Sequence, residues 1–219
     1  MTASPAPPER PPLSRERILG AAMTIADVDG LQALSMRRLG AALGVEAMSL
    51  YHHVTNKDAL LDGITDLALS DVELPAPGSD WRAGIRTIAR STHDALMRHP
   101  WAATLMLSRT IPSRFRYMEA LLGHLRTGGL SAAQTDHAYH ALDSYIAGFT
   151  LWQVGLDIDE GDLPSLARDF LATLDGDRNP YLIEHIHEHL RERDPADQGS
   201  FAFGLELILD GLERLLSGA

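Results

Sequence analysis

The chain has 219 residues, of which 45% are hydrophobic, and its formal net charge is −11. This hydrophobic content can form a sizeable core, which excludes a chain that is disordered throughout. The chain contains no cysteine, which excludes a disulfide framework, a thiolate zinc site and a cysteine nucleophile.

The first twelve residues, MTASPAPPERPP, contain five prolines and almost no large apolar side chain. We predict a disordered, proline-rich arm over residues 1–12. This segment lacks the apolar centre of a secretory signal, and no stretch of the chain approaches the roughly 18 apolar residues of a membrane span. A cytoplasmic protein that does not enter a membrane is therefore expected.

The spacing of apolar residues after the arm predicts helices almost throughout. Ser14 is placed to cap a first helix, and Gly30 to end it in the left-handed conformation. Ser35 is placed to cap a short second helix that ends at Gly44. Two tight glycine turns within about 30 residues predict a small helical head.

A third helix is predicted to begin near Glu46 or Ala47, and Asn56 to cap a fourth, KDALLDGITDLALSDV. A short helix, a glycine turn and a second short helix are typical of the helix-turn-helix unit, whose second helix enters the major groove of DNA. We therefore assign residues 13–60 to a helix-turn-helix DNA-binding domain.

The stretch ELPAPGSD, residues 73–80, interrupts the helical pattern and marks a domain boundary. Residues 61–78 are then a connecting helix and linker, and residues 79–219 form a larger domain for ligand binding and dimerisation. Further helices are predicted near residues 80–98, 101–108, 113–127, 131–156, 180–192 and 200–216. Residues 157–178, rich in Asp and Gly, predict a loop with at most a short helix. The expected fold is all-α.

Charge is distributed unevenly along the chain. Residues 1–60 carry six basic and six acidic side chains, whereas the remainder carries 13 basic and 24 acidic side chains. If the protein meets a polyanion, only the first quarter can do so without long-range repulsion.

The outward positions of the third helix suit the DNA groove. Small or apolar Ala47 and Met48 can approach base edges and thymine methyl groups without a desolvated charge. Arg37 and Arg38 of the preceding helix can reach a guanine or the backbone. Candidates for phosphate contacts are Ser49, Tyr51, His53 and Lys57. The alternative is that these side chains only interact with water.

At these residues the chain resembles the tetracycline-repressor (TetR) family of bacterial transcriptional regulators. The segment LSRERILGAAMTIADVDGLQALSMRRLGAALGVEAMSLYHHVTNKDALLDGI follows the N-terminal pattern of that family without a gap, and LGV…LYHHVTNKDALL is its most recognisable part. At the other end, FAFGLELILDGLERLL, residues 201–216, is similar to the last helix of the tetracycline-repressor branch.

The resemblance implies an all-α homodimer of nine or ten helices that binds a double-stranded DNA operator and a small-molecule effector, and a repressor rather than an enzyme. The positions that match the family's DNA contacts are Met36, Arg37, Ala47, Met48, Ser49, Leu50, Tyr51, His53 and Lys57. Ala47 and Met48 depart from the tetracycline repressor's own residues, so a different operator sequence is expected.

The last predicted helix carries an apolar stripe that is too wide for one intramolecular neighbour. Its members are Leu205, Ile208, Leu209, Leu212 and Leu216. The core of a monomer is the alternative, but the family implies that this helix and residues 131–156 pair with their twins in a four-helix interface. Such a two-fold dimer requires a palindromic operator.

An effector pocket needs an apolar lining with a few polar groups. The helices that enclose the cavity in this family supply Trp101, Met106, Phe115, Tyr117, Tyr145, Phe149, Trp152 and Gln153 as candidates. For each of them, ordinary core packing is the alternative.

The tetracycline–magnesium site of the family uses a histidine on the sixth helix and an acid late in the eighth. The histidine position falls here on Leu105 or Met106, and the acid position on about Leu156. Because both ligands are missing, we expect no metal, no cofactor and no binding of the magnesium chelate, but a more hydrophobic effector.

The sequence HIHEH supports a rival interpretation. His185, Glu188 and His189 match a zinc-protease pattern, which predicts a zinc-dependent hydrolase. A solvated helix face is the alternative, and no third ligand segment is evident. Whether His185, His187 and His189 bind a metal stays open. A helical partner-binding protein without DNA affinity is the third possibility.

Overall fold

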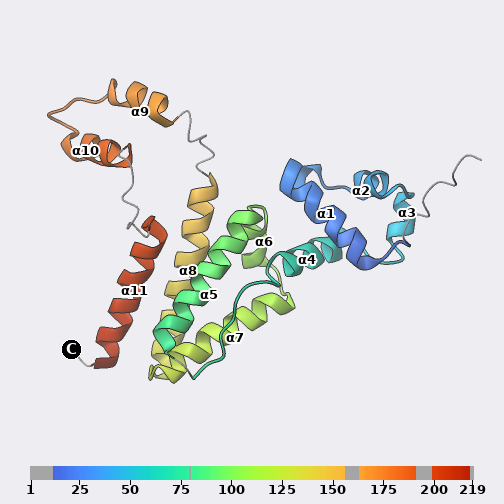
Figure 1. Ribbon diagram of the computed structural model, residues 1–219, viewed down its shortest axis with the longest axis horizontal. Coiled ribbons are helices and arrows are strands. Elements are labelled where there is room, and N and C mark those ends of the chain that lie inside the picture. Colours follow the sequence, from blue (N-terminus) through green and yellow to red (C-terminus); the bar gives the residue numbers. More distant parts are fainter. Residues whose placement is uncertain (1–11, 79, 156–162, 191–198, 218–219) are drawn as a thin grey trace, which may run out of the picture. The chain divides into compact units, whose positions relative to one another are not determined.

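A computed structural model describes residues 12–78, 80–155, 163–190 and 199–217 of the chain (Figure 1). These residues contain eleven α-helices, one 3-10 helix and no β-strand, which confirms the predicted all-α fold. Nearly all of the arm predicted over residues 1–12 lies outside the described residues. The chain forms two compact units, residues 1–147 and 148–219, with the division inside α8.

Three helices of the head begin directly after the predicted capping residues. Ser14 accepts a hydrogen bond from the backbone N–H of Arg17 at 3.2 Å, and Asn56 accepts one from Ala59 at 2.8 Å. Ser35 caps the second helix in the same way. The elements are α1 (Arg15–Asp29), η1 (Leu31–Ala33), α2 (Met36–Leu43), α3 (Ala47–Leu50) and α4 (Lys57–Ala68).

The two glycines that end helices differ from each other. Gly44, which was predicted to end the second helix, has φ 70° and ψ 33°, a left-handed conformation that favours glycine. Gly30 has a positive φ of 77°, but its ψ of 164° lies outside the left-handed helical region. The prediction of a left-handed stop at Gly30 was therefore wrong. The physical reason is that the chain turns directly into η1, where the N–H of Ala33 bonds to the carbonyl of Gly30.

A continuous core joins the helices of the head. The side chains of Ile18, Leu39, Leu50 and Ile64, one from each of α1 to α4, have no exposed surface. Helix α4 packs against α1 and also contacts α6 and α7. Helix α4 therefore connects the head to the helices that follow it in the first unit.

The rest of the first unit contains α5 (Trp81–Arg98), α6 (Ala102–Ser108), α7 (Pro112–Thr127) and the first part of α8 (Ala132–Gly155). Helices α5 and α7 pack against each other. Asp143 of α8 accepts hydrogen bonds from both terminal nitrogens of Arg114, at 2.8 and 2.6 Å, and one from the hydroxyl of Tyr117 at 3.1 Å. Burial lowers the pKa of Arg114, but its bonds to Asp143 outweigh this effect and raise it. This bidentate pair fixes α7 to α8.

The second unit adds α9 (Leu163–Leu171), α10 (Pro180–His189) and α11 (Gly199–Ser217). The family resemblance implied nine or ten helices, and α9 is the element that exceeds this number in the described residues. It lies in the stretch that was predicted to hold at most a short helix. Among the described residues, no helix is both long and apolar enough to cross a membrane.

Candidate nucleic-acid interface

The turn between α2 and α3 depends on a close approach of backbone at Gly40. A Cβ atom on this glycine would lie 2.8 Å from the carbonyl oxygen of Val45 and 3.1 Å from the nitrogen of Ala47. The N–H of Val45 also donates to the carbonyl of Gly40 at 2.9 Å. Only glycine fits at this position, so the sequence fixes how closely α3 approaches α2.

Most of the apolar residues between these two helices are buried. Leu39, Leu50 and Val54 have 3% or less of their surface exposed, and Leu43 and Val45 are half-buried. The full burial of Leu50 bears on the predicted DNA contacts, because a side chain without exposed surface is not available to a groove. Leu50 is a core residue of the head in this structure.

The opposite side of α3 presents large side chains to solvent. Met48 is 71% exposed and Tyr51 is 43% exposed. The other predicted contact residues divide into two groups by exposure. Arg37, His53 and Lys57 are exposed, and Met36, Ala47 and Ser49 are half-buried.

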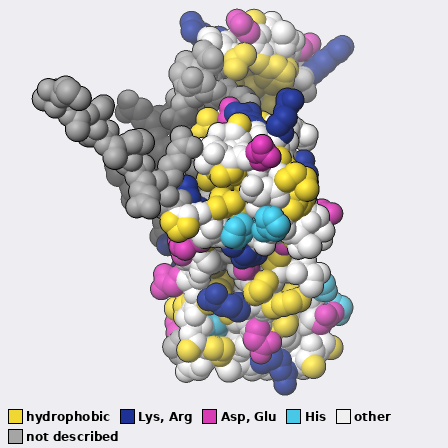
Figure 2. Space-filling model, turned by 90° about the vertical axis from the view of Figure 1, so that its right-hand side faces the viewer, with side chains coloured by type: hydrophobic (Ala, Val, Ile, Leu, Met, Phe, Trp, Pro, Cys, Tyr) yellow, Lys and Arg dark blue, Asp and Glu magenta, His cyan; other side chains and the backbone are white. Residues whose placement is uncertain are grey.

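Helix α3 has only four residues, so its outward surface continues into the turn before α4. Figure 2 faces this side of the head and shows histidine, apolar and basic side chains adjoining one another. Arg38 is drawn into an ion pair with Asp29 inside the head. We define the reading face as Met36, Arg37, Ala47, Met48, Ser49, Tyr51, His53 and Lys57.

Helix α4 is held by the segment between α6 and α7. Arg109 donates to Asp62 Oδ1 at 2.5 Å, to the carbonyl of Asp58 at 3.2 Å and to Asp58 Oδ1 at 3.3 Å. Burial lowers the pKa of Arg109, but the hydrogen bonds to Asp62 and Asp58 more than offset this and raise it. The guanidinium therefore spans one turn of α4, close to the end that enters the head.

A second contact lies one turn further along α4. Ser113, in the first turn of α7, donates its N–H to Asp66 Oδ1 at 2.8 Å and its hydroxyl to the same oxygen at 2.5 Å. Asp58, Asp62 and Asp66 follow one another at intervals of four residues, so they share one face of α4. These long-range contacts could not be read from the sequence.

The residues predicted to line an effector pocket occupy different environments. Met106 and Tyr117 are buried, Tyr145 and Phe149 are half-buried, and Gln153 is exposed. Phe115 and Trp152 are more than half exposed. Trp101 is buried, and its indole N–H is bonded to Asp27 of α1. Phe149 contacts Trp152 and Phe201 with ring centroids 5.5 and 5.4 Å apart.

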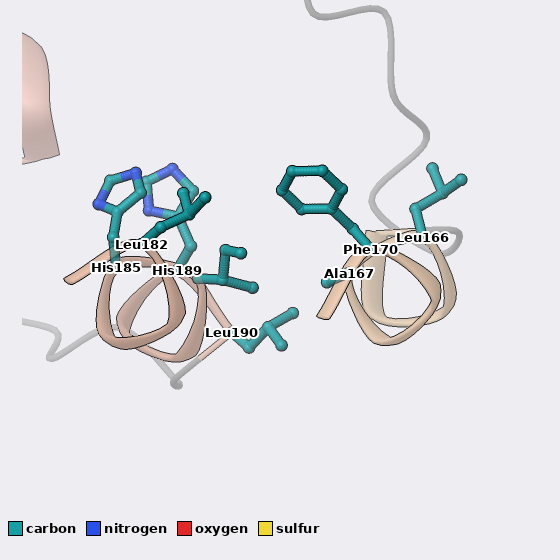
Figure 3. A pocket seen from close by; sticks show the side chains of 8 residues that line it. Leu166, Ala167, Phe170, Leu182, His185, His189 and Leu190 are labelled. Carbon is teal, nitrogen blue, oxygen red and sulfur yellow. The ribbon is translucent and has the colours of Figure 1, made fainter. Parts of the chain in front are cut away.

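An open groove of about 350 Å³ lies between α9 and α10 (Figure 3). It is lined by Leu166, Ala167, Phe170, Leu182, His185, Ile186, His189 and Leu190. None of these residues was predicted to line a pocket. The signal that could have found it is the i,i+4 spacing of Leu166 and Phe170, which α9 brings to one face.

The histidines of the zinc-protease pattern lie on the rim of this groove. The rings of His185 and His189 are 4.9 Å apart, and both side chains are exposed on α10. Within the described residues, no three His, Asp or Glu side chains are grouped so that they could hold a metal ion. The geometry therefore gives a hydrolase no support.

The predicted dimer stripe of α11 is mostly turned inward. Leu205, Leu209 and Leu212 are buried within the chain, and Ile208 and Leu216 are half-buried. The large apolar side chains that α11 exposes are Phe203 at 68%, Leu207 at 56% and Leu215 at 58%. These three residues recur at multiples of four, so they form one stripe, which we call the open stripe of α11.

Comparisons with known proteins agree on one family. The profile described as bacterial regulatory proteins, tetR family, matches residues 18–64. The profile described as tetracyclin repressor-like, C-terminal domain, matches residues 74–216.

Individual relatives extend over almost the whole chain. The HTH-type transcriptional repressor DrrR1 of Streptomyces coeruleorubidus is 35% identical, over 95% of this chain and 80% of its own length. The class D tetracycline repressor protein of Escherichia coli is 31% identical, over 94% and 91%. The solved structure of the TetR family protein ActR of Streptomyces coelicolor with (S)-DNPA is 31% identical, with a TM-score of 0.75 over 95% of this chain and all of ActR. ActR has also been solved with actinorhodin.

Proposed function

The chain belongs to the TetR family and is a ligand-responsive, DNA-binding transcriptional regulator, and we propose that its reading face contacts an operator. The observation that carries this proposal is the contrast across α3, where Leu50 is fully buried while Met48 and Tyr51 point to solvent. Two large side chains exposed next to each other form a surface that a partner can cover. We assign Met48 to base edges and Tyr51, His53 and Lys57 to phosphates.

The regulator acts in our proposal as a two-fold dimer in the bacterial cytoplasm. Relatives of this kind typically form dimers, and the open stripe of α11 supplies an apolar surface that no contact within the described chain covers. We therefore move the proposed interface on α11 from the buried Leu205, Leu209 and Leu212 to Phe203, Leu207 and Leu215. Two-fold symmetry would place two reading faces about one DNA turn apart, which requires an operator with inverted repeats.

The effector in our proposal is a small hydrophobic molecule. ActR, which is similar over nearly the whole chain, has been solved with (S)-DNPA and with actinorhodin, which supports an organic effector. Leu105 and Met106 occupy the region where a magnesium chelate needs a histidine, and Met106 is buried. Leu156, at the position of the acid, lies outside the described residues. We propose that the protein does not bind the tetracycline–magnesium chelate.

Repression ends, in this proposal, when the effector moves α4. Arg109 and Ser113 hold α4 from the α6–α7 segment, so a displacement of that segment is transmitted to the head. A shift from almost fully DNA-competent to almost fully released protein requires about 5.5 kcal/mol of differential effector affinity. The burial of a drug-sized apolar molecule is of the right order to supply much of it.

Selection of bound sequences from random duplex DNA tests this function. The expected result is enrichment of one inverted repeat, and a Met48→Ala protein should enrich a repeat with altered bases at the positions that Met48 faces. The enriched duplex then serves to screen hydrophobic compounds for release of the protein. A protein that enriches no sequence, or one without two-fold symmetry, would contradict the proposal.

A further inference from the structure

One carboxylate of the head is held by the junction between α5 and α6. Asp27, in the last turn of α1, accepts a hydrogen bond from the indole Nε1–H of Trp101 at 2.6 Å. The Nδ1 atom of His99 lies 2.8 Å from the same oxygen, Oδ1. These partners are 74 and 72 positions away in the sequence. The contact therefore joins the head to the junction of α5 and α6 in the same unit.

The neighbouring acid of α1 shows that this arrangement is particular to Asp27. Asp29, two residues further on, pairs with Arg38 inside the head. Asp27 instead meets a tryptophan that is only 9% exposed and a histidine whose side chain is 18% exposed. The indole ring is thus buried, and its N–H bonds to the head.

The chemistry of the contact makes it directional. An indole N–H can only donate, and a carboxylate can only accept, so no exchange of roles restores the bond once the two groups move apart. Hydrogen bonds to a charged acceptor are also roughly twice as strong as neutral ones. A rotation of the head that carries Asp27 away from Trp101 breaks this bond.

We propose that Asp27, Trp101 and His99 form a second tether of the head, separate from α4, and that this tether sets the orientation in which the reading face meets DNA. Trp101 immediately precedes α6, so a movement of α6 acts on α1 through Asp27 as well as on α4 through Arg109. Asp27 and Trp101 are positioning residues, since neither belongs to the reading face. The consequence for transcription rests on the proposed function, but the tether itself does not.

The absence of cysteine from the chain permits a direct test. Cysteines introduced at Gln32 of η1 and Glu119 of α7, both exposed, carry spin labels on the head and on the larger helices. Doubly labelled protein is diluted with unlabelled protein, and pulsed electron paramagnetic resonance measures the distance within one chain. The variants are Asp27→Ala, Asp27→Asn, Trp101→Phe and the matched control Asp29→Ala. Trp101→Phe keeps an aromatic ring but removes the N–H donor.

We expect one narrow distance distribution in the unsubstituted protein, in Asp27→Asn, which keeps an acceptor oxygen, and in Asp29→Ala. Trp101→Phe and Asp27→Ala should broaden or shift it while thermal unfolding stays cooperative. Unchanged distributions in both would overturn the tether, because a contact that only adds stability does not move this distance.

Affinity for the duplex enriched by selection is the second readout. The two disruptive variants should bind it about five- to tenfold more weakly than Asp29→Ala does. Equal affinity would overturn the role in orienting the reading face. If no duplex is enriched, the proposed function fails, whereas the distance measurement still decides whether the tether exists.

Discussion

Ser113 gives both of its donors to Asp66: its N–H and its hydroxyl reach the same carboxylate oxygen, at 2.8 and 2.5 Å. The hydroxyl also lies 2.9 Å from the carbonyl oxygen of Asp66. Ser113 is 6% exposed, so these bonds form largely out of water. They attach the start of α7 to the last turn of α4, so Asp66 holds the end of that helix that is farther from the head, while Arg109 holds the end nearer the head.

Replacement of Ser113 by Ala should lower the free energy of unfolding by about 1–2 kcal/mol, because the charge-assisted bond of the hydroxyl is lost while the N–H bond remains. Urea denaturation measures this change. Ser108→Ala is the matched control, since the hydroxyl of Ser108 is exposed and bonds only within its own helix. A Ser113 variant as stable as the control would show that the hydroxyl contact contributes nothing to the free energy of unfolding.

Replacement of Arg109 by Ala should weaken operator binding about fivefold without changing its salt dependence, because Arg109 lies on the α6–α7 segment and makes no phosphate contact in our proposal. Arg109→Lys should give a smaller loss, since one ammonium group cannot span Asp58 and Asp62 as the guanidinium does. Titration of the enriched duplex at several salt concentrations measures both quantities. A reduced salt slope would instead place Arg109 on the DNA.

Acid should destabilise the protein in part through His93. Burial lowers the pKa of His93 from its ordinary value of 6.5, against the opposing charge of Asp94. As the pH falls through about 6.5, His93 therefore takes up a proton in the unfolded chain before it does so in the folded chain. The free energy of unfolding decreases as a result. His93→Gln should lose less stability between pH 7.5 and 5.5 than the unsubstituted protein. His137 is exposed, so His137→Gln should lose as much stability over this range as the unsubstituted protein. If His93→Gln also loses as much, His93 is not a source of the acid sensitivity.

A charge placed in the open stripe of α11 should disrupt the dimer. Leu207→Asp should convert the dimer to monomers, because it places a charge in a two-fold apolar interface where each copy meets its twin. Sedimentation velocity reports the change. Leu107→Asp alters an equally exposed leucine of α6 and should leave the dimer intact. A Leu207 variant that sediments as the unsubstituted dimer would move the interface elsewhere.

Local signals in the sequence predicted the helices well. Ser14, Ser35 and Asn56 all cap the helices that follow them, because a cap depends on a side chain and a backbone group only three residues apart. Gly44 ends α2 as predicted, for the same local reason. The conformation of Gly30 is also set locally, by the bond from Ala33, but the 3-10 turn that makes this bond was not predicted from the sequence.

Two features of the site were beyond prediction for physical reasons. A helix such as α11, with apolar residues on most of its faces, gives no indication of which stripe is covered within the chain. Leu205 and Leu207 differ in exposure only through tertiary packing. The contacts of Asp27 with Trp101 and of Asp66 with Ser113 join residues 74 and 47 positions apart, and a single sequence carries no pattern for such pairs.

The reading face is tested most directly by equilibrium titration of the enriched duplex with Tyr51→Ala and Lys57→Ala proteins across a range of salt concentrations. Exposed Arg98 of α5, replaced by Ala, is the control for loss of a charge outside the head. We predict that Tyr51→Ala weakens binding about tenfold and that Lys57→Ala lowers the salt slope by about one. Affinities and slopes equal to those of Arg98→Ala would contradict the assignment of this surface to DNA.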